Sequence, residues 1–179
     1  MKKYLFTVAA LLLVLTCVNA QQRNTSRKEP GKKQQDQDFV QQATASGKAE
    51  VRLGELGQLR GTHVMVKEFG MMMVKDHQQA NQELEELAKQ EGYADMPEIA
   101  EAADDEAYQQ LSKKQGADFD KAFAQQMVKD HEKAVRLFTM QAEKGKERQL
   151  KQWAAQKLPV LKEHLEHARR LQETIKQKK

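Results

Sequence analysis

Cysteine is almost absent from this chain of 179 residues. Its one cysteine, Cys17, lies in an N-terminal segment that we expect to be removed. Residues 1–20 begin with a lysine pair, continue through an apolar stretch and end in Val18-Asn19-Ala20, the pattern of a cleavable export signal. A mature chain beginning at Gln21 would contain no cysteine. This excludes disulfides, iron–sulfur clusters, thiolate zinc sites and thiol nucleophiles.

An alternative interpretation keeps Cys17 as the lipid-bearing residue of an anchored lipoprotein. Thr16 precedes it, where lipoprotein signals favour Gly, Ala or Ser. Long hydrophobic runs are also missing, since the apolar part of the signal is shorter than the ~20 residues of a permanent membrane span. We therefore expect an exported protein of the periplasm or cell envelope with no transmembrane segment.

The sequence has no large excess of charge of one sign, with 30 Lys and Arg against 26 Asp and Glu. The small surplus of +4 comes from residues 1–36, which hold seven basic and two acidic groups, so the rest of the chain has a net charge of −1. Signs are interspersed there, and no basic stretch suits a phosphate backbone. We therefore exclude nucleic acid as a partner.

Proline and glycine are also few, at 3 and 9 residues, and no strand pattern is present. After the signal, residues 21–37 carry almost no apolar side chains and are predicted to be a flexible polar tether. From residue 38 onward, apolar residues recur at helical spacing. Long helices are predicted at about 37–60, 62–90, 118–143 and 146–176, with a short helix inside 93–116; Thr62 and Asp118 are predicted helix caps.

These elements predict an all-α protein: a ferritin-like four-helix bundle over residues 38–176, made of two antiparallel hairpins joined by a long crossover that contains the short helix. An internal repeat supports the bundle. Residues 69–88 and 123–142 share eight identities in twenty, including an unbroken Met-Val-Lys-Asp-His block. The two middle helices are therefore interpreted as equivalent elements of the bundle.

Each long helix presents one polar candidate on its inward-facing stripe when residues are placed at about 100° per residue. The candidates are Glu50, His77, His131 and His164. Asp76 and Asp130 flank the stripes and would orient the imidazoles or act as alternative ligands. Imidazoles and carboxylates from facing helices are how bundles bind first-row metals, and zinc, copper and iron all suit this donor set.

Counting residues from the hairpin apices at Gly61 and Gly145 predicts that the four candidates lie on two levels, ~8 Å apart. Glu50 would lie level with His164, and His77 with His131. This separation favours a buried hydrogen-bond network over one compact ligand cluster. The methionines at 71–73, 127 and 140 would suit Cu(I), but methionine at helical spacing usually fills the core.

Several features together resemble an exported bacterial family, domain-of-unknown-function family 4142. They are the signal, the Glu-bearing first helix, the paired Met-Val-Lys-Asp-His blocks, the Gly116–Asp120 helix start and the Leu158–Leu165 segment. The resemblance covers about residues 38–172 and implies a ferritin-like bundle in the cell envelope, without implying a reaction. The Glu-x-x-His pairs of di-iron enzymes are missing, because Val74, Val128 and Leu161 stand three residues before the histidines.

From the sequence we favour a non-enzymatic structural, stress-related or interaction protein of the envelope, with a buried Asp/His/Glu network. The alternative is a ferritin-like protein that binds zinc, copper or iron for storage, sensing or redox chemistry. Envelope proteins and metal ions are the expected partners. Hydrolase chemistry has little support, because the predicted bundle has only Ser46 and Ser112 and lacks a nucleophile-elbow pattern or a glycine-rich phosphate loop.

Overall fold

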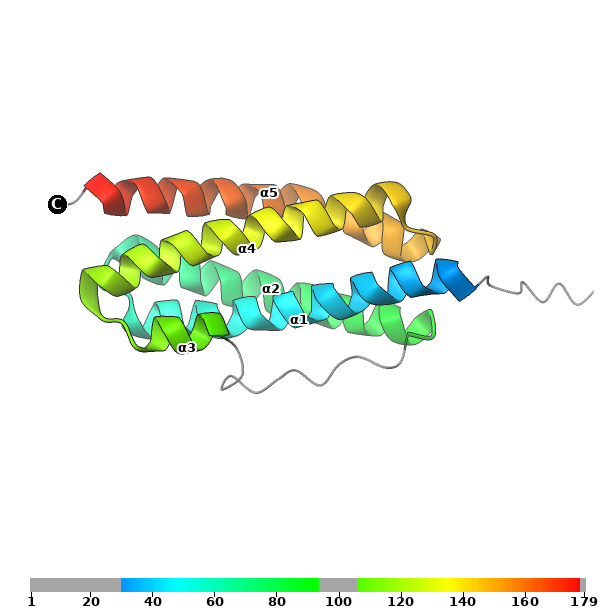
Figure 1. The fold of residues 1–179 in the computed structure, drawn as a ribbon, viewed down its shortest axis with the longest axis horizontal. Coiled ribbons are helices and arrows are strands. Elements are labelled where there is room, and N and C mark those ends of the chain that lie inside the picture. The colour runs from blue at the N-terminus through cyan, green and yellow to red at the C-terminus, as the bar shows by residue number, and fades with distance from the viewer. Residues whose placement is uncertain (1–29, 94–105, 178–179) are drawn as a thin grey trace, which may run out of the picture.

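The computed structural model describes residues 30–93 and 106–177. In these ranges it contains five helices: α1 (Pro30–Arg60), α2 (Val64–Gln90), α3 (Glu106–Ser112), α4 (Gly116–Lys144) and α5 (Arg148–Gln177). Figure 1 shows α1 and α2 as one antiparallel hairpin and α4 and α5 as the other, with their loops at opposite ends of the bundle. The predicted all-α fold of two hairpins with a short crossover helix is confirmed.

The start of α1 differs from the prediction. The helix begins at Pro30 and not at Gln37, so part of the segment predicted to be a tether is helical. Proline suits a first helical turn, which has no use for its missing N–H. Asp36 is buried, and its carboxylate accepts hydrogen bonds from the backbone N–H groups of Lys146 and Glu147 at 3.1 and 2.7 Å. Tertiary contacts therefore stabilise a turn that has no apolar pattern of its own.

The two helix caps predicted from the sequence, Thr62 and Asp118, also differ from what the structure shows. The residue before α2 is His63, whose Nδ1 accepts from the Met65 N–H, while Thr62 donates to Asp120. The Asp120 carboxylate also accepts from the N–H groups of Thr62 and His63, at 2.9 and 2.8 Å. Asp118 lies inside the first turn of α4, which begins at Gly116. His63 therefore caps α2, and the buried carboxylate of Asp120, far away in sequence, binds the backbone of the two residues just before this helix.

Asp36 and Asp120 form a reciprocal pair. Each comes from the first helix of one hairpin and accepts hydrogen bonds from the loop of the other hairpin. The two loops lie at opposite ends of the bundle (Figure 1). The two aspartates are 84 positions apart, as are the two loops they contact. The Met-Val-Lys-Asp-His repeat, with an offset of 54, instead relates α2 to α4.

Helices α1 and α2 approach closely where Gly54 faces Gly70. A Cβ atom built on Gly54 would lie 2.8 Å from the carbonyl oxygen of Gly70, and one on Gly70 would lie 2.6 Å from that of Gly54. Side chains at either position would push the backbones apart. Gly54 and Gly70 thus set the spacing of this hairpin.

The apolar core consists of two clusters, one toward each end of the bundle. The cluster nearer the α1–α2 loop is built around Leu53, Phe69, Phe123, Met127 and Leu171. The one nearer the α4–α5 loop is built around Phe39, Leu84, Phe138, Leu150 and Trp153. Along every long helix, a polar residue separates the positions of the two clusters. In the described residues, no helix is long and apolar enough to cross a membrane.

The predicted signal at residues 1–20, with Cys17, and the predicted tether as far as residue 29 lie outside the described residues.

Candidate metal centre

Four buried polar side chains form a layer between the two apolar clusters, one from each long helix. Glu50 comes from α1, His77 from α2, His131 from α4 and His164 from α5. Their exposed fractions are only 6, 8, 1 and 2%, respectively. The helical wheel predicted that these four face inward, and their burial confirms it. His167, on the same helix as His164, is exposed.

The three histidines lie together in one cluster. Ring centroids are 5.7 Å apart for His77 and His131, 5.6 Å for His77 and His164, and 5.4 Å for His131 and His164. Each residue can offer one ring nitrogen such that the three nitrogens lie within 4.8 Å of one another. The predicted separation of His164 from His77 and His131 by a level is therefore wrong.

Loop geometry and side-chain direction explain the correction. The prediction counted every loop residue as a step of helical rise, whereas residues 145–147 turn the chain without advancing it. Counted from the ends of α4 and α5, His131 and His164 lie 13 and 16 residues from the loop, a difference worth ~4.5 Å. Helical side chains lean toward their own N-terminus, so on antiparallel helices these two lean toward each other.

Hydrogen bonds determine which nitrogen of two of the rings carries the proton. His131 Nδ1 lies 2.9 Å from the backbone carbonyl oxygen of Met127. A carbonyl only accepts, so Nδ1 is the donor and Nε2 holds the lone pair. His164 Nε2 lies 3.0 Å from Asp76 Oδ2, so this nitrogen donates and Nδ1 holds the lone pair. This arrangement, in which one ring nitrogen is anchored and the other left basic, is typical of metal-binding histidines.

One ring nitrogen of each histidine has no hydrogen-bond partner among the described residues. Among the described residues, His77 Nε2, His131 Nε2 and His164 Nδ1 are buried without a hydrogen-bond partner. A buried polar atom left unsatisfied typically destabilises a protein by about 1–3 kcal/mol. Three such nitrogens close together are therefore suited to binding a cation that accepts their lone pairs.

All three imidazoles have lowered pKa values. Burial, followed by the neighbouring His131 and His164, lowers the pKa of His77 to about 3. Burial lowers the pKa of His131 to about 4, against the opposing effect of its bond to Met127. Burial also lowers the pKa of His164, and Asp76 opposes this shift. The cluster is therefore neutral at pH 7, as metal ligation requires.

The predicted carboxylates take different places around the cluster. Glu50 Oε1 lies 4.0 Å from His131 Nδ1. Asp76 contacts the imidazole of His164 on α5, and not that of its sequence neighbour His77. Asp130 accepts a hydrogen bond from Gln126 Nε2 at 2.6 Å. Asp76 thus has the orienting contact with an imidazole that the sequence predicted.

The methionines are not gathered around the histidines as a group. Met73 and Met127 are fully buried and belong to the apolar cluster near the α1–α2 loop. Met71 and Met140 are half exposed, at 52 and 50%. The expectation that methionine at helical spacing fills the core is confirmed for Met73 and Met127.

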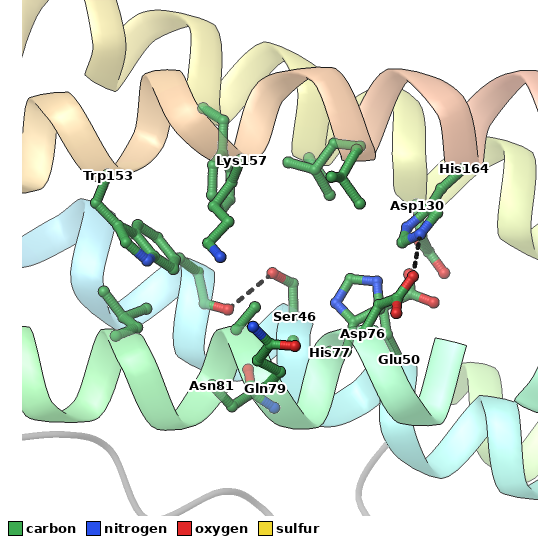
Figure 2. A pocket seen from close by; sticks show the side chains of 18 residues that line it. Ser46, Glu50, Asp76, His77, Gln79, Asn81, Asp130, Trp153, Lys157 and His164 are labelled. Atoms are coloured by element: carbon green, nitrogen blue, oxygen red, sulfur yellow. Dashed lines mark hydrogen bonds and ion pairs between the residues drawn. The ribbon is translucent and has the colours of Figure 1, made fainter. Parts of the chain in front are cut away.

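A cavity of about 200 Å³ adjoins the histidine cluster. Glu50, Asp76, His77 and His164 form one end of it, and Trp153 and Lys157 lie at the other (Figure 2). Sequence reasoning missed Trp153 and Lys157 as residues near the site. Both residues belong to α5, and no local sequence motif distinguishes them. Only the packing of α5 against the other hairpin places them at the cavity.

Comparisons with known proteins agree with this fold. The structure is similar to CopM in the Cu(II)-bound form, with a TM-score of 0.63 and 16% identity, over 78% of this chain and 97% of that chain. CopM in the Cu(I)-bound form gives a TM-score of 0.65 at 16% identity, over 78 and 96% of the two chains. A DUF305 fragment from Deinococcus radiodurans gives 0.66 at 14% identity, over 79 and 95%.

A search of curated proteins found no match. The model of one family, described as "Domain of unknown function (DUF4142)", matches residues 21–171. This is most of the chain, and it is the family that the paired Met-Val-Lys-Asp-His blocks and the other sequence features resemble. The chain therefore belongs to the DUF4142 family.

Proposed function

We propose that this protein binds a transition-metal ion, with copper as the first candidate, through His77, His131 and His164. The observation that carries the proposal is the set of three buried, unpartnered ring nitrogens, one from each histidine. The bonds to Met127 and Asp76 leave the lone pairs of His131 and His164 on those nitrogens. A bound cation would satisfy all three nitrogens at once.

The rival interpretation, a purely structural polar network, explains less of the layer. It accounts for the contacts of His131 and His164 with Met127 and Asp76. It gives no reason for three neutral imidazoles to converge without a donor between them. The structural role that the sequence favoured is therefore the weaker proposal.

Copper is favoured for two reasons. Among divalent first-row metals, sites of nitrogen and oxygen donors bind Cu²⁺ most tightly, and imidazole suits it well. Structurally similar CopM has been characterised with Cu(I), Cu(II) and silver. Glu50 is buried in the same layer, and its Oε1 lies 4.0 Å from His131 Nδ1, the nitrogen bonded to Met127. We further propose that the protein acts in the cell envelope, after removal of residues 1–20.

The test is metal analysis of the purified protein, metal-free and after incubation with copper, zinc or iron. We expect one equivalent of copper per chain, lost in the His77→Ala/His131→Ala double variant. His167→Ala removes an exposed histidine of α5 and is the matched control, which should keep the metal. Equal copper in the wild type and the double variant would contradict the proposal.

Intact mass of the exported protein tests the predicted N-terminus at Gln21.

A further inference from the structure

The cavity beside the histidine cluster is large enough for a molecule. Its volume of about 200 Å³ exceeds the ~150 Å³ of an engineered protein cavity that binds benzene. His77 and His164 line it, whereas His131 is not among its lining residues. A metal ion held by the three histidines would therefore present one side to this space.

The walls favour an apolar body. Alanine, leucine, valine, phenylalanine and tryptophan side chains make up much of the lining, from all four long helices. Trp153, the single tryptophan of the chain, is 8% exposed and lies at the end away from the histidines (Figure 2). A flat ring fits a space of this size with such walls.

The charges around the cavity favour a neutral ligand. Three carboxylates, Glu50, Asp76 and Asp130, line the end near the histidines, and their charge offsets that of a bound metal ion, which reduces the attraction of the site for an anion. Lys157 is the cation of the lining, but it forms an ion pair with Glu83 and lies 5.9 Å from the ring centroid of Trp153. Its charge is therefore already compensated.

We propose that this cavity admits a small, neutral, one-ring nitrogen donor, which ligates the metal on the side left open by the three histidines. The inference rests on the proposed metal site and adds to it a ligand class and a place for the ligand. The carboxylates disfavour anionic donors of similar size, and the apolar side chains of the lining contact the ring.

The experiment titrates imidazole and, separately, azide into the metal-loaded protein. Zn(II)-loaded protein is followed by the fluorescence of Trp153, and Cu(II)-loaded protein by its electron paramagnetic resonance and visible spectra. We expect imidazole to change all three signals and to bind at least ten-fold more tightly than azide. Azide binding as tightly as imidazole would overturn the charge argument.

Cavity-filling variants locate the ligand. Ala80, one turn after His77, lines the cavity, and Ala80→Leu should weaken imidazole binding at least ten-fold while copper content stays unchanged. Ala155→Leu places the same side chain on the exposed face of α5 and should bind imidazole like the wild type. If Ala80→Leu fails to fold, Ala134→Leu fills the cavity from α4.

The outcomes separate the two proposals. A wild-type protein that retains no metal would overturn the proposed function and the ligand site with it. A protein that retains copper, but binds imidazole equally well with and without the cavity-filling residue, would overturn the ligand site alone.

Discussion

Asp76 shows how a single residue shapes the candidate centre. It is partly exposed, yet its carboxylate accepts the Nε2 proton of the buried His164 from across the α2–α5 contact. The bond holds the ring in one tautomer and one orientation. The basicity of Nδ1, the nitrogen that faces the cluster, therefore depends on a residue outside the layer.

Replacing Asp76 tests this dependence. Asp76→Ala should lower copper affinity by about 10- to 100-fold, because His164 loses the group that orients it. Competition with a chromophoric copper chelator measures the change. Glu163→Ala removes an exposed carboxylate next to His164 in sequence and is the control, with affinity expected within about two-fold of the wild type. Equal affinities of the two variants would mean that Asp76 does not orient the ligand.

At the scale of helices, the two hairpins are held in register by carboxylates exchanged between them. Asp36 on α1 binds backbone N–H groups of the loop just before α5, and Asp120 on α4 binds those of the loop just before α2. Both aspartates are buried, at 1 and 3% exposure. Each carboxylate therefore ties one hairpin to the loop of the other, so axial sliding of the hairpins would break both sets of bonds.

Removing either carboxylate should destabilise the protein. For Asp36→Ala and Asp120→Ala we expect a loss of about 1–3 kcal/mol each in the free energy of unfolding, because partly buried backbone N–H groups lose their acceptor. Urea denaturation measures the change. Asp118→Ala, two residues away and exposed, should change stability by less than about 0.5 kcal/mol. The two losses should add in the double variant, since the loops that these carboxylates bind are at opposite ends.

For the whole molecule, the histidine layer links folding to pH and to metal. The pKa values of His77 and His131 in the folded protein are about 3 and about 4, below the ordinary value of 6.5. Below pH 6.5 the unfolded chain takes up protons that the folded protein refuses. Stability from these groups is therefore complete above pH 6.5 and decreases as the pH falls toward the folded values.

Unfolding of the metal-free protein in urea at pH 7.5 and 5.0 tests this linkage. We expect each of the two histidines to reduce stability by about 2 kcal/mol over this interval. His131→Leu should remove its share of the decrease. Copper at 100 times its Kd should add about 2.7 kcal/mol at pH 7.5 to the wild type and much less to His131→Leu. A pH dependence unchanged by His131→Leu would show that this imidazole titrates normally in the folded state.

Local patterns in the sequence were sufficient to predict the long helices and the residues that face inward. The 3.6-residue period predicts four long helices, and the same period places Glu50, His77, His131 and His164 on inward stripes, because the direction of a side chain around its helix depends on residues of that helix alone. Burial of all four confirms this. The missing Glu-x-x-His pairs, and the position of the one cysteine, Cys17, in the predicted signal, also narrow the set of possible metal ligands without reference to the fold.

Tertiary structure decided what lies beside what. Helical periodicity says nothing about the position of a residue along the bundle axis. That position depends on how the loops turn and on how side chains of opposing helices lean. The three histidines therefore meet on one level, which residue counting did not predict. The partner of Asp76 on α5, and the N–H groups of Lys146 and Glu147 that bind Asp36 of α1, likewise lie in the other hairpin. Contacts between residues far apart in sequence leave no local pattern, and the candidate centre is made of such contacts.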